Sequence, residues 1–175
     1  MKNKLVFATL AIAGALAMGH AHAQQPAAPN PLDAIPDKMP FDIPYGTPIT
    51  LDRAQEVLAA AVAEAKKRDY KLSVAVVDSG GSLLAFARMD GAALSSIAIS
   101  EHKARAAVLF RRETKAFEAG VQGGLTYQLS LDGMIASRGG IPLVENGKII
   151  GAIGASGGTG SQDEVGSKAG AALIK

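Results

Sequence analysis

The chain has 175 residues, no cysteine, and 18 Lys and Arg against 16 Asp and Glu. The absence of cysteine excludes disulfides, thiol catalysis and zinc-thiolate sites. The near balance of charge provides no broad basic surface for nucleic acid, so any basic cluster has to be argued locally.

The first 23 residues are expected to be a secretory signal peptide. Lys2 and Lys4 precede an apolar run from Leu5 to Met18, and Ala21-His22-Ala23 supplies the small residues that signal peptidase requires. The run is shorter than the roughly 20 residues of a membrane span. Cleavage removes two lysines and no acid, which leaves 16 residues of each charge in a periplasmic or secreted product without a membrane anchor.

Residues 24–48 are expected to form an extended, proline-rich arm. They hold seven of the eight prolines in the chain, and proline lacks the backbone donor that helices and sheets need. The remaining residues, 49–175, have a normal size for one domain with a single core.

The first half of this domain predicts a helix, a β-hairpin and a second helix. Thr50 is placed to cap a helix whose apolar residues recur every three or four positions as far as Arg68. Two β-rich runs, Leu72–Val77 and Leu83–Met89, flank turn residues and indicate a hairpin. Helical spacing resumes from Leu94 to Phe110.

The second half predicts short helices, another hairpin and a closing helix. Asn146-Gly147 suits the positive φ angles of a type I′ turn between two strands. The expected elements are helices at Glu113–Ala119 and Tyr127–Ala136, strands at Ile141–Val144 and Ile149–Ile153, and a helix at Gln162–Ile174. The order α-β-β-α-α-β-β-α predicts an α/β (α+β) fold with an antiparallel sheet between helical layers.

A glycine-rich segment raises the question of a serine hydrolase. Gly154 to Gly158 fits G-x-S-x-G, the pattern that presents a nucleophilic serine. In that fold a histidine follows the serine along the chain, whereas His102 precedes Ser156. We therefore interpret the glycines as turn residues, with exposed N–H groups that could hold an anion at the start of the last helix.

His102 is the only histidine that signal cleavage leaves behind. On a helix it shares a side with Ala98, Ile99, Ala106 and Leu109. One interpretation is a histidine hydrogen-bonded in the core or in a subunit contact. The other is an axial ligand to haem iron, with basic residues near the propionates. The basic residues close in sequence are Lys103, Arg105, Arg111 and Arg112, and the reserve iron ligands are Met89, Met134 and Tyr127.

Four segments together resemble the GlcG/HbpS-like family, which includes the C-terminal domain of PduO-type proteins. They are "VVDSGGSLLAFARMDGA", "SEHKARAAVLFRRETKAF", "GGIPLVENGKIIGAIGASG" and "QDE", in the same order and at compatible spacing across the folded domain. The resemblance implies a profilin-like α/β/α domain, assembly into dimers or higher homo-oligomers, and haem binding or slow haem degradation. The expectation of haem degradation depends on this resemblance alone, because the sequence shows no recognisable group of catalytic residues.

Three functional hypotheses follow. The first is a periplasmic haem-binding protein for storage, scavenging or sensing, with His102 as the iron ligand. The second is an accessory module that binds a small organic acid such as glycolate, and the third is a purely structural oligomer. The haem site is predicted to contain His102, Lys103, Arg105 and Met89, and the acid site Arg88, Ser156, Gly157 and Gly158. Lys103 has a competing structural interpretation, an ion pair with Asp90 or Glu101.

Overall fold

The structure is a computed structural model that describes residues 33–175. The expected signal peptide and the first part of the arm lie outside the described residues. Lys38–Lys175 form one compact unit, and the description below concerns this unit. No helix among residues 33–175 has both the length and the apolar character needed to cross a membrane.

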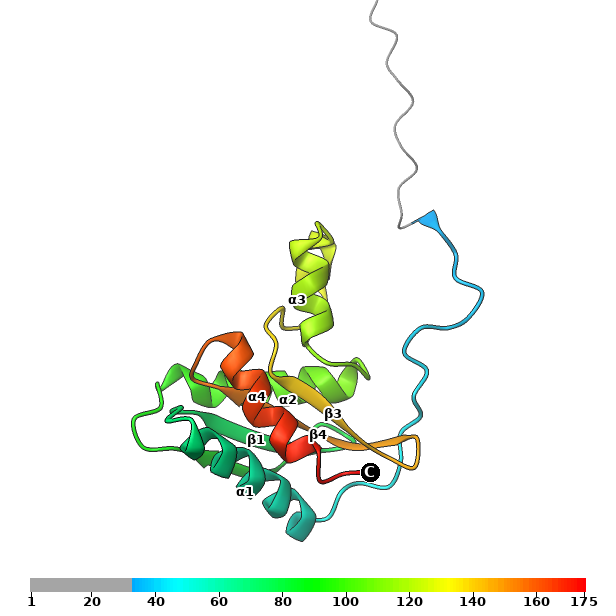
Figure 1. Ribbon diagram of the computed structural model, residues 1–175. Coiled ribbons are helices and arrows are strands. Elements are labelled where there is room, and N and C mark those ends of the chain that lie inside the picture. Colours follow the sequence, from blue (N-terminus) through cyan, green and yellow to red (C-terminus); the bar gives the residue numbers. More distant parts are fainter. Residues whose placement is uncertain (1–32) are drawn as a thin grey trace, which may run out of the picture. The chain divides into compact units, whose positions relative to one another are not determined.

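The centre of the unit is a four-stranded antiparallel sheet, as predicted (Figure 1). The strands are β1 (Ser73–Asp78), β2 (Leu83–Arg88), β3 (Gly140–Glu145) and β4 (Lys148–Ser156), in the spatial order β2-β1-β4-β3. Each predicted hairpin is present, and β1 pairs with β4 to join them. Asn146 and Gly147 have φ angles of 48° and 73°, which agrees with a type I′ turn.

Helices cover both faces of the sheet (Figure 1). On one face α1 (Leu51–Lys67) and α4 (Gly160–Ala171) enclose the larger apolar core, which includes Val57, Leu72 and Ile153. On the other face α2 (Ser95–Leu109) packs on a smaller core of mostly Ala and Val side chains. Both faces of β1 are buried, because each face meets a helix.

The helix starts differ in detail from the sequence expectation. Thr50 occupies the position before α1, but its hydroxyl makes no capping hydrogen bond. The closing helix begins two residues earlier than predicted, because Thr159 and Gln162 form a reciprocal capping box.

The expected helix at Tyr127–Ala136 is wrong. The chain forms α3 (Lys115–Gln122), then the short 3₁₀ helix η2 (Thr126–Ser130), and it is non-helical from Leu131 to the start of β3. Gly133 has a φ angle of 77°, in the left-handed region that ends a right-handed helix.

Part of the proline-rich arm lies against the sheet. The Gly46 N–H donates to Ile149 O at 2.8 Å, and the Ile149 N–H donates to Pro44 O at 2.8 Å. The Tyr45 hydroxyl donates to Val108 O at the end of α2, at 3.0 Å. These bonds involve residues N-terminal to Ile49, and they fix the end of the arm beside β4 and α2.

The backbone of α2 lies directly on the sheet at two glycines. A Cβ on Gly154 would collide with Ser100 O and would lie 2.5 Å from Ala104 N. A Cβ on Gly140 would collide with Lys103 O. Because these neighbours are backbone atoms of a packed helix, neither can move aside as a flexible side chain would.

We expect Gly154→Ala to destabilise the fold by about 1–3 kcal/mol or more through overpacking. Urea unfolding of the variant and the wild type measures this loss. Gly80→Ala is the matched control, because its added Cβ meets a single atom within 4 Å, Asp78 Oδ1 at 3.3 Å. Equal stability of the two variants would contradict the close approach of α2.

Candidate functional site

His102 lies on the outer side of α2, where it is exposed to solvent. It lines an open cleft of about 330 Å³ whose other lining residues are Ala98, Glu101, Arg105, Leu109 and Gly133. The α-helical repeat explains most of this set, because Ala98, Arg105 and Leu109 are three, four or seven residues away from His102. Gly133 comes from the segment that was expected to be helical.

No hydrogen bond to either ring nitrogen of His102 is formed by the residues that the structure describes. Because His102 is exposed, its interpretation as a core histidine is wrong, whereas the alternative of a subunit contact stays a prediction. Ala98 and Leu109 give the cleft an apolar surface, and Arg105 adds a cation one turn from the imidazole. This combination of a free imidazole, an apolar surface and a guanidinium can hold a flat, apolar, acidic ligand.

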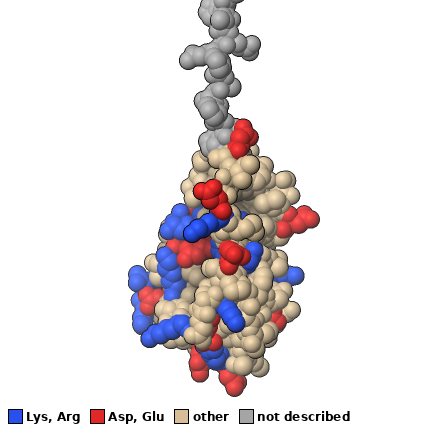
Figure 2. Space-filling view, turned by 90° about the vertical axis from the view of Figure 1, so that its right-hand side faces the viewer, with Lys and Arg blue, Asp and Glu red and all other residues tan. Residues whose placement is uncertain are grey.

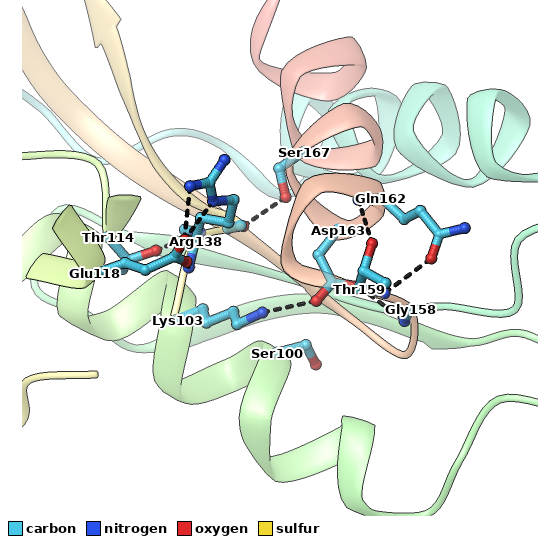
Figure 3. Close-up of polar contacts among 12 residues, drawn as sticks. Ser100, Lys103, Thr114, Glu118, Arg138, Gly158, Thr159, Gln162, Asp163 and Ser167 are labelled. Carbon is cyan, nitrogen blue, oxygen red and sulfur yellow. Dashed lines mark hydrogen bonds and ion pairs between the residues drawn. The ribbon is translucent and has the colours of Figure 1, made fainter. Parts of the chain in front are cut away.

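Lys103 points to the opposite side of α2 and is 1% exposed. Its Nζ lies 2.8 Å from Asp163 Oδ2 of α4 in a buried ion pair (Figure 3). The expected partners Asp90 and Glu101 are thus replaced by an acid 60 residues away. Lys103 does not join His102 and Arg105 in the cleft, since one helix presents them on different faces.

Asp163 also closes the glycine-rich turn before α4. Its Oδ1 accepts the Gly158 N–H at 3.0 Å, and Gln162 Oε1 accepts the Thr159 N–H at 2.8 Å (Figure 3). Two of the backbone donors proposed for an anion, those of Gly158 and Thr159, are therefore bonded to side chains of the same chain. Burial raises the pKa of the Asp163 carboxyl, and the hydrogen bonds from Lys103 and Gly158 oppose this rise.

A second charge cluster ties α3, α4 and the chain before β3 together. Arg138 Nη2 lies 2.6 Å from Glu118 Oε1, and its Nη1 lies 3.6 Å from Glu164 Oε2. Glu164 is 6% exposed and also pairs with Lys115 and Lys168. The hydrogen bond from Arg138 lowers the pKa of the Glu118 carboxyl, and the one from Lys168 lowers that of Glu164.

Arg88 and Met89 lie at a different cleft, of about 390 Å³, between α1 and the end of β2. Its other lining residues are Val62, Lys66, Lys71, Ala87 and Asp90. Ser156 is 6% exposed at the end of β4, and Gly157 is packed against the backbone of Lys71. The cleft lining thus includes neither Ser156 nor the two glycines that were expected to act with Arg88. Met89 is likewise separate from His102.

The described surface carries mixed charge. On the face shown in Figure 2, basic and acidic side chains lie beside one another. Among residues 33–175 no three His, Cys, Asp or Glu side chains converge in a way that could hold a metal ion.

Residues 49–172 match the sequence profile of the family described as haem-degrading protein HbpS-like. The chain belongs to the HbpS-like family. The match spans all four strands and the helices around them, so the family resemblance inferred from the sequence is confirmed.

Individual relatives of this HbpS-like chain agree with the assignment. Protein GlcG of Escherichia coli K12 is 46% identical over 103 residues, which cover 59% of this chain and 77% of GlcG. A double mutant of HbpS from Streptomyces reticuli aligns with a TM-score of 0.68 and 31% identity, over 81% of this chain and 97% of that one. A structure named as a PduOC:haem complex aligns with a TM-score of 0.67 and 28% identity, over 74% and 96% of the two chains.

We expect Lys103→Met to cost about 3–5 kcal/mol of unfolding free energy, because it leaves the Asp163 carboxylate buried without its cation. Lys67→Met is the control, since that Lys side chain is 74% exposed and its pair with Glu64 contributes less than about 1 kcal/mol. Denaturant unfolding measures both losses. The double variant with Asp163→Asn is expected to lose less than the two single losses added together, and additive losses would contradict the coupling.

The lowered pKa of Glu164 predicts that this residue stabilises the fold less at acidic pH. Its pKa is lower in the folded state than in the unfolded chain, so the stabilisation is present above the ordinary carboxyl value and is lost as the pH falls through the folded value. We expect Glu164→Gln to flatten the loss of stability between about pH 5 and pH 3. Urea unfolding across this range, with Glu56→Gln on the exposed side of α1 as the control, measures the slope. Parallel curves for wild type and Glu164→Gln would contradict this role.

Proposed function

We propose that this chain is an exported haem-binding protein that uses His102 as the iron ligand. The observation that carries the proposal is the exposed imidazole in an apolar cleft beside Arg105. Family membership and a relative whose structure is named as a haem complex support haem as the ligand. Storage, scavenging or sensing is the role proposed for the bound haem.

The residues of the cleft fit a haem group. A neutral imidazole is a common protein ligand of haem iron, and a cation beside an apolar surface suits propionates attached to a macrocycle. His102 would coordinate the iron, Leu109 and Ala98 would contact the ring, and Arg105 would pair with a propionate. When bound, haem would supply the iron centre for any redox chemistry.

The cleft that contains His102 is small for a whole haem group. A volume of about 330 Å³ lies at the lower end of the range for small-molecule pockets. A single chain would therefore leave part of a macrocycle open to solvent. Leu109, at the edge of this cleft, is 52% exposed, which agrees with closure by a second copy in the homo-oligomer expected from the resemblance.

We expect haemin added to the protein lacking residues 1–23 to give a sharpened, shifted Soret band. His102→Ala removes the proposed iron ligand and is expected to change that band and weaken haemin binding about tenfold or more. Gln55→Ala, an exposed change on α1, is the control and is expected to leave the titration unchanged. Absorbance titration measures both quantities.

Two outcomes would contradict the proposal in different ways. A spectrum of His102→Ala identical to the wild type would remove His102 from the iron. The absence of any haemin response at micromolar concentration in the wild type would refute haem binding itself.

A further inference from the structure

Arg112 lies in a cleft separate from that of His102. The cleft has a volume of about 340 Å³ and shares no lining residue with the His102 cleft. Phe41 and Ile43 of the arm form one part of its wall, and Ile141, Pro142 and Val144 of β3 form another. Arg112 follows the C-terminal end of α2 and introduces a guanidinium into these mostly apolar surroundings.

Two aromatic rings lie against this guanidinium. Its Cζ is 3.7 Å from the ring centroid of Phe41 and 4.5 Å from that of Phe117. Phe117 is buried and is held by an edge-to-face contact with Phe110, with ring centroids 5.0 Å apart. Cations are attracted to the faces of aromatic rings, so these contacts orient the Arg112 side chain. They satisfy none of its N–H donors, which need an acceptor atom.

Arg112 has no acidic partner within residues 33–175. Its side chain forms no hydrogen bond or ion pair with these residues, and its Nε is fully buried without an acceptor. Burial also lowers the pKa of the Arg112 guanidinium. A buried N–H donor that lacks an acceptor is costly, and Arg112 as a whole is half-buried.

The acidic groups nearby are engaged elsewhere. Asp42 lies 3.7 Å from Arg111, which also reaches Ile43 O. Glu113 lines the same cleft but is exposed, and its charge acts on Lys168 of α4. The positive charge of Arg112 is therefore left for a group that residues 33–175 do not provide.

We propose that this cleft binds a carboxylate that carries a flat apolar body. The guanidinium of Arg112 pairs with the carboxylate, because its planar donors match the two oxygens. Ile43, Ile141 and Val144 contact the apolar body. The cleft volume is within the range of small-molecule sites. This site is independent of the proposed haem ligand His102 and of Arg88.

Benzoate is the probe for this site, and benzamide, which has the same shape without the charge, is its control. We expect benzoate to bind the protein in a calorimetric titration and benzamide to bind at least tenfold more weakly. Arg112→Gln is expected to weaken benzoate binding by about tenfold to a hundredfold, the loss of a charge-assisted contact. Arg68→Gln, at the exposed end of α1, is the matched variant and should keep the wild-type affinity.

Several results would overturn the proposal. These are no benzoate binding at millimolar concentration, equal binding of benzamide, or unchanged affinity in Arg112→Gln. If Arg112→Gln fails to fold, amide chemical shifts of the wild type decide. Benzoate-induced shifts at Ile141 and Val144 uphold the site, and shifts confined to other regions overturn it.

The same chemistry is present in a free aromatic acid and in the propionate-bearing edge of haem. Haemin added to the benzoate complex distinguishes the two sources. Displacement of benzoate that is retained in His102→Ala identifies haem as an occupant of the Arg112 cleft. Benzoate binding that haemin does not change identifies a small acid as the occupant. In that case the haem proposal is tested separately, by the haemin titration of the wild type and His102→Ala.

Discussion

The buried ion pair between Lys103 and Asp163 is the interaction on which the rest of the structure depends. It joins α2, on one face of the sheet, to α4 on the other, and Asp163 holds the Gly158 turn as well. A buried pair of this kind requires good geometry, because each charge has lost its water. Gly140 and Gly154 supply that geometry by letting the backbone of α2 rest on β3 and β4. The orientation of α2, and hence of His102 on its outer side, follows from these contacts.

Much of the fold could be predicted because local chemistry and global structure agree. The dipeptide Asn146-Gly147 favours a tight turn, and the spacing of the apolar residues between Leu51 and Lys67 predicts the helix α1. The prediction failed at Tyr127–Ala136, where apolar residues resemble a helical stripe but Gly133 adopts a left-handed conformation. Apolar spacing does not determine φ at a single glycine, so it could not show that the chain from Leu131 onward is non-helical.

The candidate site was predictable only in part. His102 and its helical neighbours can be identified from the sequence, and Arg105 does line the cleft with His102. The burial of Lys103 could not be predicted from the sequence. The buried face of α2 contains Ser96, Ser100 and Lys103 instead of large apolar residues. Polar residues indicate an exposed face unless their partners are known, and Asp163 lies 60 positions away. The charge cluster around Arg138 and the cleft at Arg112 likewise join segments that no local pattern connects.

The two sides of α2 differ in how strongly packing constrains their residues. On the side that faces the sheet, the backbone of α2 at Ser100, Lys103 and Ala104 packs directly against Gly140 and Gly154. Substitutions on this side therefore disturb the packing. Toward solvent, Ala98, His102 and Arg105 contribute little to that packing. A helix divided in this way allows ligand preference to diverge among proteins that share the scaffold, since new side chains can appear on the outer side without altering how the helix is seated.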